Sequence, residues 1–436
     1  MAPVAIATAS PLHVVLLAIG SLGDAGPLHL IARALHRRGH AVTLVALPGF
    51  QTAAEDEFEV VTAPQDLAPE LAESQGAARW FTKTWVGRGL SSWRASVPLT
   101  LRRARWVYGF LQERHQRGKT VVLARSGLFG ARIAREGMEL RLISVHHTPA
   151  PLRSRYESFV LPVPEGEYGA LRLARGLLWR CMDGYVGTLL LPSLNTFRRE
   201  LKLPPIRRLF DRWAFSPDMN MALFPEWYAS PQPDWPAHTH LAGFPLSDEQ
   251  PLHELSEEVQ AFLGCGGPVI VFTRGSHSAS GAEFFRMARD VCWARGWRGL
   301  ILGLAPESVA EFHNPAVLQV RFAPLAAVLR RASLLVHHGG IGTCALAFRA
   351  GVPQIMIPGI GDQWDQAKRV ARLGCGIYLS MRSLNRARLA SAQMSLLHSD
   401  EARARCVRVA EMVRADGISR ACSLVELAGR PPVGAA

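Results

Sequence analysis

The chain has 436 residues, of which 48 % are hydrophobic and 19 % are charged. A chain of more than about 300 residues exceeds what one hydrophobic core usually supports, so we expect two domains. No apolar stretch reaches the roughly 18 uncharged residues that a membrane-spanning helix needs, and no such helix is predicted.

The net charge is +13, and only four of the 49 basic residues are lysines. The arginines are scattered, without the basic tail or the aromatic-interleaved block of a nucleic-acid-binding protein, so no nucleic-acid partner is expected. One basic concentration, at residues 101–119, has roughly helical spacing. It can be a surface helix with a solvated basic face, or a face that meets lipid headgroups or an anionic acceptor, and the sequence leaves both interpretations open.

The seven cysteines show no CxxC or metal-type spacing, which indicates reduced thiols in a cytosolic protein. Residues 1–12 lack the basic start of a signal peptide and are interpreted as a loose extension. The folded part is therefore expected to begin with the apolar residues from position 13.

The first third of the chain alternates predicted strands and helices. A strand is predicted over residues 13–19, a helix over 27–38 and a strand over 41–46. This βαβ unit requires a parallel sheet with a right-handed crossover. Two more strands and a helix follow, and residues 150–235 are interpreted as helices and loops over this sheet. The further elements are strands at 121–124 and 141–145 and a helix at 128–136.

A proline-rich stretch at 230–245 is interpreted as a linker between a first domain, 1–235, and a second, 236–436. The second domain repeats the alternation, with strands predicted at 269–273, 300–304, 317–322, 334–336, 354–357 and 376–379. The fold class is therefore α/β, with two facing Rossmann-like domains and the active site in the cleft between the carboxyl ends of their strands. A helix at 417–428 is expected to cross back to the first domain.

The most informative segment runs from residue 336 to residue 367. A strand ends at HHGG (residues 337–340), and the apolar spacing of a helix follows. A glycine-rich turn before a helix N-terminus lets backbone N–H groups approach an anion. The next strand ends at Asp362 and Gln363, whose side chains suit sugar hydroxyls. The two strand ends together indicate a nucleotide-sugar enzyme.

This segment resembles the nucleotide-binding signature of the large glycosyltransferase family that includes UDP-sugar, sterol and antibiotic glycosyltransferases. Other motifs resemble the rhamnosyltransferases of rhamnolipid synthesis, and the resemblance spans roughly residues 13 to 425. These motifs are AIGSLGDAGPLHLIARALHRRGHAVTL at 18–44, LLWRC at 177–181, DWP and GFPL between 234 and 246, and GVPQ, DQWDQA and RLGCG between 351 and 376.

The resemblance implies the GT-B fold and an inverting transfer without a retained covalent intermediate. It implies L-rhamnose from dTDP-L-rhamnose as the donor sugar and a 3-(3-hydroxyalkanoyloxy)alkanoic acid as the acceptor, giving a mono-rhamnolipid biosurfactant. Such an acceptor leaves peripheral contact with the cytoplasmic face of the inner membrane open. Two alternatives also stay open: a glycosyltransferase with another nucleotide sugar and a sterol, polyketide or other lipid acceptor, and a non-catalytic nucleotide-binding activator.

The resemblance also assigns roles to residues. His337 is expected to touch the diphosphate, and His338 occupies a variable position of the motif. Phe322 corresponds to an aromatic residue that stacks on the nucleotide base, although a core phenylalanine at a strand end is nearly as plausible from sequence. Asp362 and Gln363 are expected to hold the sugar. Further diphosphate contacts are expected from Gly275, Ser276, Gly339, Gly340, Gly342 and Thr343. No DxD pair follows a strand, so we expect neither a metal ion nor any cofactor.

Asp24 stands where many relatives carry a histidine base, and the resemblance makes it the candidate general base. The alternative is a helix cap, a common role for aspartate at the start of a helix. The position of the base's usual partner falls near Arg125, so the His–Asp dyad of the family is predicted to be absent. An apolar acceptor groove can be built from aromatic residues that are more often core, namely Trp80, Phe81, Trp85, Trp93, Trp106 and Phe110.

Overall fold

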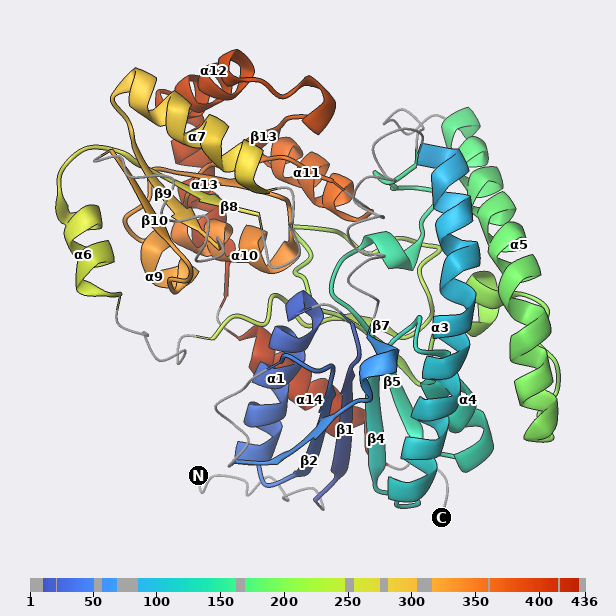
Figure 1. Ribbon diagram of the computed structural model, residues 1–436. Coiled ribbons are helices and arrows are strands. Elements are labelled where there is room, and N and C mark those ends of the chain that lie inside the picture. The colour runs from blue at the N-terminus through green and yellow to red at the C-terminus, as the bar shows by residue number, and fades with distance from the viewer. Residues whose placement is uncertain are drawn as a thin grey trace, which may run out of the picture.

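The computed structural model describes residues 11–20, 22–50, 57–68, 85–161, 169–247, 255–274, 281–303, 316–359, 361–414 and 416–430. Two α/β domains, each built on a sheet, lie on opposite sides of a central region where their loops meet (Figure 1). Every strand pairing in both sheets is parallel. The predicted fold class is confirmed.

The first sheet has seven strands in the order β3-β2-β1-β4-β5-β6-β7. Its strands are β1 His13–Ala18, β2 Ala41–Ala46, β3 Glu59–Thr62, β4 Thr120–Arg125, β5 Arg141–His146, β6 Met219–Ala222 and β7 Thr239–Leu241. The central strand β1 is buried on both faces: Val14 and Leu16 join one core cluster, and Val15 and Leu17 join another. A continuous apolar run is the pattern expected of a parallel strand covered on both sides.

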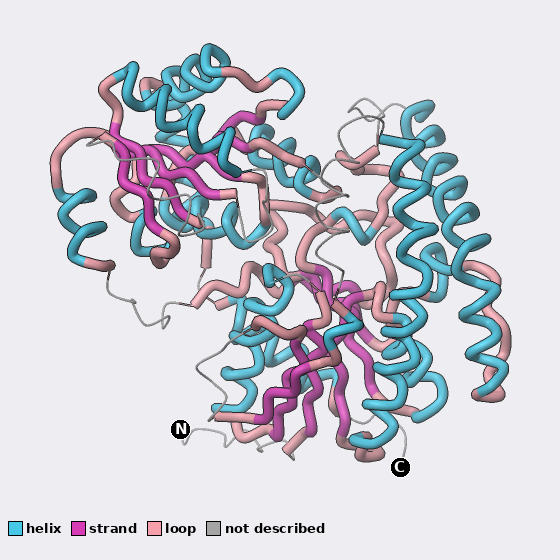
Figure 2. The backbone as a smooth tube through the Cα atoms, viewed as in Figure 1, coloured by secondary structure: helices cyan, strands magenta, loops and turns pink. Residues whose placement is uncertain are grey.

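Helices cover both faces of this sheet (Figure 2). The helix α1 (Leu22–Arg37) packs on one face, and α3 (Trp85–Arg114) and α4 (Phe129–Met138) pack on the other. A long helix, α5 (Gly169–Glu200), lies outside α3 and shares an apolar cluster with α3, α4 and the short helix η3 (Leu209–Trp213). Two single 3-10 turns, η1 (Gln65–Leu67) and η2 (Ala150–Leu152), complete this domain.

The second sheet has six strands in the order β10-β9-β8-β11-β12-β13. Its strands are β8 Val269–Thr273, β9 Arg298–Leu302, β10 Val317–Val320, β11 Leu334–His337, β12 Gln354–Met356 and β13 Gly376–Tyr378. Its helices are α6 Glu257–Gly264, α7 Gly281–Arg295, α9 Leu325–Leu329, α10 Ile341–Ala350, α11 Gln363–Arg372, α12 Arg386–Leu397 and α13 Asp400–Met412, with the 3-10 turn η4 at Met381–Ser383. Separate apolar clusters lie on its two faces.

The last helix, α14 (Gly417–Ala428), returns to the first domain, as the sequence predicts. Its buried residues Ala421, Cys422 and Val425 belong to the core cluster under α1. The guanidinium of Arg38 donates to Glu426 Oε1 at 3.1 Å, which ties the two helices at their surface. A side chain at Gly417 would place its Cβ 2.2 Å from the carbonyl oxygen of Phe244, so only glycine fits where the chain enters this helix.

Two elements differ from the sequence prediction. The first sheet continues to β7 at Thr239–Leu241, beyond the predicted domain boundary at residue 235. The strands β6 and β7 have only four and three residues, too short for a detectable alternation. The helix α1 begins at Leu22 and runs through Pro27 instead of starting there, so Asp24 lies in its first turn.

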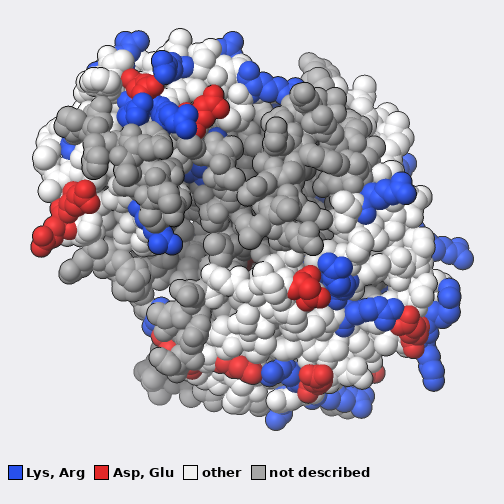
Figure 3. Space-filling model, viewed as in Figure 1, with Lys and Arg blue, Asp and Glu red and all other residues white. Residues whose placement is uncertain are grey.

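None of the described helices is long and apolar enough to cross a membrane. All seven cysteines are free thiols. The basic side chains are interspersed with acidic ones on the face shown in Figure 3, and several lie along the margin formed by α5.

Candidate active site

The HHGG turn lies between β11 and α10. Gly339 has φ +92°, a left-handed conformation that favours glycine, and a Cβ there would lie 3.2 Å from the carbonyl oxygen of Gln363. Gly340 is the N-cap residue of α10. The N–H of Cys344 donates to Gly340 O, so the three N–H groups before it point out of the helix end. Gly342 and Thr343 belong to this exposed first turn, which suits an anion.

His337, which is predicted to touch the diphosphate, makes its contacts within the turn and with β12. Its side chain is buried, with 1 % exposure, and both ring nitrogens are used. Nδ1 accepts from Gly339 N–H at 3.2 Å, and Nε2 lies 3.0 Å from Oε1 of Gln354 on β12. Burial lowers the pKa of His337 to about 3, so the ring is neutral. His337 therefore helps to hold the turn together.

His338 takes the position at the helix end instead. Its ring is half-buried, and Nε2 would lie 2.6 Å from a Cβ added at Gly340, the N-cap of α10. A histidine nitrogen beside a helix N-terminus adds a side-chain donor where backbone donors already converge. His338 is therefore a second candidate, beside His337, for contact with an anion at this helix end.

The Asp362–Gln363 turn meets the HHGG turn, as the sequence predicts for the carboxyl ends of neighbouring strands. Asp362 precedes α11 and accepts from Gln366 Nε2 at 3.2 Å. Gln363 Oε1 accepts from Gly359 N–H at 2.8 Å, which fixes the amide just beyond β12. Burial raises the pKa of Asp362 above its ordinary value.

Phe322 follows β10, and 73 % of it is exposed. The alternative interpretation of Phe322 as a core residue is therefore wrong, and an exposed aromatic ring at the carboxyl edge of the sheet is available for stacking. Gly275 and Ser276, also predicted to contact the diphosphate, lie outside the described residues.

On the first-domain side, Asp24 forms a compact group with two other side chains. Its Oδ2 accepts from Nη1 of Arg125 at 2.7 Å, and its Oδ1 lies 3.8 Å from Nε2 of His147. A Cβ at Gly20 would lie 2.3 Å from Asp24 Oδ2, so glycine at this position leaves room for the carboxylate. Asp24 lies within the helix and not at its N-cap, which removes the capping interpretation.

His147 is a functional candidate that sequence reasoning missed. It follows β5, is 8 % exposed, and neither ring nitrogen has a hydrogen-bond partner among the described residues. Burial lowers the pKa of His147 to about 4, with Asp24 opposing and Arg125 adding to this shift. At neutral pH the imidazole is therefore uncharged and able to accept a proton.

The two histidine pairs of the chain follow one pattern. In each pair the first residue ends a strand and meets a polar side chain on the next strand. His146 Nε2 lies 3.4 Å from Asn220 Oδ1 on β6, just as His337 meets Gln354 on β12. The second residue, His147 or His338, lies beyond the strand at the carboxyl edge. A strand covered on both faces buries its last side chain, so only the residue after it can turn towards a ligand.

Charges of the first domain reach the donor-side turn. Burial raises the pKa of Asp362 and the bond from Gln366 lowers it, and smaller effects come from Arg125, Asp365 and Asp24. The donor-side turn of the second domain is therefore within electrostatic range of the group around Asp24.

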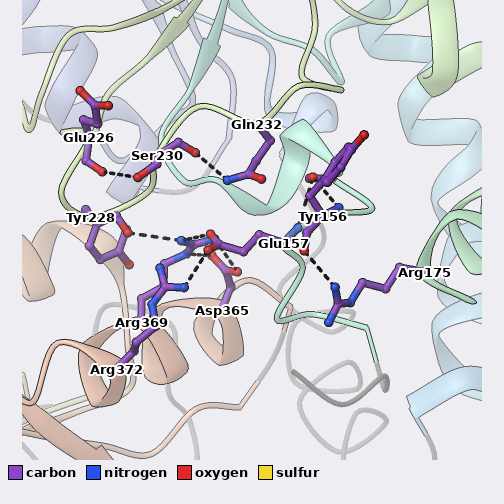
Figure 4. Close-up of polar contacts among 11 residues, drawn as sticks. Tyr156, Glu157, Arg175, Glu226, Tyr228, Ser230, Gln232, Asp365, Arg369 and Arg372 are labelled. Atoms are coloured by element: carbon purple, nitrogen blue, oxygen red, sulfur yellow. Dashed lines mark hydrogen bonds and ion pairs between the residues drawn. The ribbon is translucent and has the colours of Figure 1, made fainter. Parts of the chain in front are cut away.

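An ion cluster joins the domains beside this site (Figure 4). Glu157, on the loop after β5, accepts from Arg369 Nη1 at 2.5 Å and from Arg372 Nη1 at 2.7 Å. Arg369 also donates to Asp365 Oδ2 at 2.8 Å and to the carbonyl oxygen of Tyr228 at 3.3 Å. Because α11 begins directly after Asp362, the cluster fixes the donor-side turn against the first domain.

The predicted aromatic groove is only partly visible. Phe110 is buried in the core between the sheet and α3, and Trp106 stacks on it at 5.1 Å between ring centroids. These two residues belong to the core and do not form a groove. Trp80 and Phe81 lie outside the described residues, as do the side chains of Trp85 and Trp93.

The basic stretch at 101–119 packs through its apolar residues, and some of its arginines are paired. Arg105 donates to both carboxylate oxygens of Glu200, at 2.6 and 2.7 Å, and Arg114 pairs with Glu59 at 2.7 Å.

Among the described residues, no group of three or more His, Cys, Asp or Glu side chains is arranged to hold a metal ion.

Solved structures of glycosyltransferases match this architecture over nearly the whole chain. The glycotransferase of kitacinnamycin matches with a TM-score of 0.68 and 19 % identity, covering 96 % of this chain and 100 % of the other. The spinosyn rhamnosyltransferase SpnG complexed with thymidine diphosphate matches with a TM-score of 0.61 and 17 % identity, covering 95 % and 99 % of the two chains. Both matches establish the GT-B fold.

Sequence comparison supports the same assignment. Residues 306–423 match the C-terminal domain family of the erythromycin biosynthesis protein CIII. Glycosyltransferase GtfC of Amycolatopsis orientalis is 33 % identical over 234 residues, covering 53 % of this chain and 56 % of the relative. The chain therefore has the GT-B fold, and its second half is similar in sequence to antibiotic glycosyltransferases. Residues 306–423 contain both the HHGG turn and the Asp362–Gln363 turn.

Proposed function

We propose that this chain is a glycosyltransferase that moves L-rhamnose, with inversion, from dTDP-L-rhamnose to the hydroxyl of a 3-(3-hydroxyalkanoyloxy)alkanoic acid. The observation that carries a transfer reaction is the opposition of Asp362 in the second domain to Asp24 and Arg125 in the first. A donor held at one turn would present its anomeric carbon to an acceptor held at the other.

Two observations support the donor class. The first turn of α10 and His338 form an anion-binding arrangement at the carboxyl edge of the second sheet. A rhamnosyltransferase with thymidine diphosphate bound is among the structures with this fold. Phe322 is proposed to stack on the base, and Asp362 and Gln363 to accept from and donate to the sugar hydroxyls.

Departure of the nucleoside diphosphate requires stabilisation of growing negative charge. In this proposal the N–H groups of the first turn of α10, Thr343 and His338 supply it. A preorganised donor aimed at developing charge contributes about 3 kcal/mol to catalysis. None of these proposed contacts to the diphosphate requires a metal ion.

We propose that His147, rather than Asp24, takes the acceptor proton. Arg125 occupies one oxygen of Asp24, whereas His147 is neutral and its Nε2 is unengaged among the described residues. The acceptor oxygen attacks the anomeric carbon as the bond to the diphosphate breaks. The proton passes to His147 Nε2, and the carboxylate of Asp24 stabilises the imidazolium that forms.

The test is transfer itself. The purified chain is incubated with dTDP-L-rhamnose or UDP-glucose and with a hydroxy-fatty-acid ester, a sterol or a polyketide aglycone, and the product masses are read. A hydroxy-fatty-acid ester that carries rhamnose on its hydroxyl through a glycosidic bond supports the proposal. Transfer to a sterol or polyketide, or glucose as the only donor sugar, selects the alternative substrates. Nucleotide binding without transfer or donor hydrolysis selects the non-catalytic activator.

A further inference from the structure

A large cavity lies in the first domain, away from the nucleotide-side turns. Its volume is about 1150 Å³, slightly above the roughly 300–1,000 Å³ typical of small-molecule sites. It opens between the first half of α5, the loop after β5 and the segment before β7. Apolar side chains form most of its wall, namely Leu152, Leu173, Leu177, Trp179, Phe210 and Phe215.

Two of these apolar residues are unusually exposed. Leu173 is 76 % exposed and Leu177 is 63 % exposed, one helical turn apart on α5. Two large aliphatic side chains open to solvent beside a cavity offer a surface for aliphatic chains.

The cavity also carries excess positive charge, because five arginines and three aspartates line it. Each aspartate has a hydrogen-bond or ion-pair partner within the protein. Asp234 accepts from Ser154 Oγ at 2.7 Å, Asp183 accepts from Phe210 N–H at 3.0 Å, and Asp211 pairs with Arg208. Arg153 lies 3.8 Å from Asp183, and Arg155 lies 3.8 Å from Asp234. Arg132 pairs with Glu136 at 2.7 Å, so two of the five arginines, both on α5, have no carboxylate partner among the described residues.

Two arginines of the lining are available to a ligand. Arg180 is exposed, and no carboxylate among the described residues pairs with it or with Arg172. Arg172 lies over the ring of Tyr156 at 5.0 Å, which holds its guanidinium at the surface. Both residues are on the first half of α5, close in sequence to the exposed leucines.

The cavity reaches towards the proposed acid–base group. Its inner wall includes Phe215, whose ring centroid lies 5.7 Å from that of His146, the residue before His147. Leu152 and Arg153 of the lining lie on the loop that leaves β5 at His147. The inner wall of the cavity therefore lies beside the end of β5, one residue before His147.

We propose that this cavity binds an amphiphilic carboxylate, with its aliphatic chains along Leu173 and Leu177 and its carboxylate at Arg172 and Arg180. The inference rests on the proposed function in so far as the bound amphiphile is the acceptor. A carboxylate matches the guanidinium geometry, and the volume accommodates more than one aliphatic chain.

Binding can be measured without any transfer reaction, by calorimetry with decanoate, 1-decanol and acetate. We expect decanoate to bind more tightly than either 1-decanol or acetate, because it alone offers both chain and charge. Arg172→Ala combined with Arg180→Ala should weaken decanoate binding about tenfold and leave 1-decanol binding within about twofold. Leu177→Ser should weaken both chain-bearing ligands.

Arg199→Ala is the matched control, because Arg199 is an exposed arginine on the same helix outside the cavity lining. Its decanoate affinity should equal that of the unaltered chain. The inference is overturned if decanoate shows no saturable binding, if the Arg199 variant loses as much affinity as the double variant, or if the double variant binds decanoate normally.

The outcome is separable from that of the proposed function. Arginine-dependent decanoate binding with no transfer to any acceptor would keep the site and remove the transfer proposal. Transfer to a carboxylate acceptor with an unchanged KM in the double variant would keep the proposed function and remove this site.

Discussion

The Nε2 atom of His147 lies 3.8 Å from the Oδ1 atom of Asp24. This separation is too long for a hydrogen bond and short enough for one acceptor oxygen to contact both groups. The other oxygen of Asp24 is held by Arg125 at 2.7 Å. The family's usual arrangement places a histidine on the first loop. Here the carboxylate lies in the first turn of α1, and the histidine follows β5.

Asp24→Asn should lower turnover by about 10²–10⁴-fold, the usual range for loss of acid–base function. Asparagine keeps the size of the side chain but cannot stabilise an imidazolium or accept a proton. His147→Gln should have a similar effect, and the double variant should be little worse than either, because the two residues act as a unit. Single-turnover rates together with dTDP affinity and melting temperature provide the measurement.

A turnover for Asp24→Asn equal to that of the unaltered chain would remove Asp24 from the mechanism. Full loss in Asp24→Asn with normal turnover in His147→Gln would return the base to Asp24 and remove the proposed role of His147. Arg117→Ala is a suitable control, since Arg117 forms an exposed ion pair with Glu139 far from the cleft loops.

His338→Ala should weaken dTDP binding about tenfold by removing a donor near the diphosphate. Asp362→Ala should leave dTDP binding nearly unchanged and impair transfer, because its proposed partners are sugar hydroxyls. His337→Ala should instead lower the melting temperature, since it breaks the buried bonds to Gly339 and Gln354. Calorimetric titration with dTDP checks all three variants.

If His337→Ala loses dTDP affinity at an unchanged melting temperature, His337 is the ligand-facing histidine after all. Equal loss of dTDP affinity in the His338 and Asp362 variants would show that the two strand ends do not divide donor recognition as proposed.

Much of this arrangement is predictable from the sequence. The strands β2 and β8 have the bounds predicted from the sequence, because a parallel strand buried on both faces is a largely apolar stretch. The meeting of the HHGG and Asp362–Gln363 turns follows from the common carboxyl edge of adjacent parallel strands. Both features depend on local pattern and on topology.

The orientation of individual side chains was not predictable in the same way. His337 and His338 are adjacent residues of the same type, so the sequence does not show which ring is buried. The buried ring is that of His337, because β11 ends at this residue. His147 lies more than one hundred residues from Asp24, and their contact arises from the neighbouring positions of β1, β4 and β5 in the sheet. The strands β6 and β7 were not predicted, because these short segments become strands by pairing with β5 and with each other in the folded sheet.

Activity in excess EDTA should equal activity without it, because the leaving diphosphate is proposed to be held by His338, Thr343 and the first turn of α10. The measurement is the initial rate after dialysis against chelator, with magnesium added back to a parallel sample. A strict requirement for magnesium would contradict this account of leaving-group stabilisation.

Stability should fall as the pH drops below about 6.5. The buried rings of His146, His147 and His337 have pKa values lowered by burial to about 4, 4 and 3. The unfolded chain, with histidine pKa values near 6.5, binds more protons in this range, so unfolding becomes more favourable. Each histidine contributes a slope of up to about 1.4 kcal/mol per pH unit between the two pKa values.

Urea unfolding between pH 7.5 and 4.5 measures this slope. His337→Gln keeps a polar side chain at the position but removes one titrating group, so its stability should depend less steeply on pH. An equally steep dependence in this variant would contradict the assignment of a strongly lowered pKa to His337.

The interdomain ion cluster gives a prediction with an internal control. Arg369 and Asp365 are almost completely buried, and Arg369 also pairs with Glu157 across the domains. Arg369→Met should lower the free energy of unfolding by about 3–5 kcal/mol, because it leaves buried carboxylates without a counter-charge. Arg372→Met removes a half-exposed partner of the same Glu157 and should cost less than about 1 kcal/mol. Since α11 carries the donor-side turn at its start, the Arg369 variant should also raise the KM for the donor, while decanoate binding stays unchanged. Comparable small losses of stability in the two variants would show that the cluster does not fix α11 against the first domain.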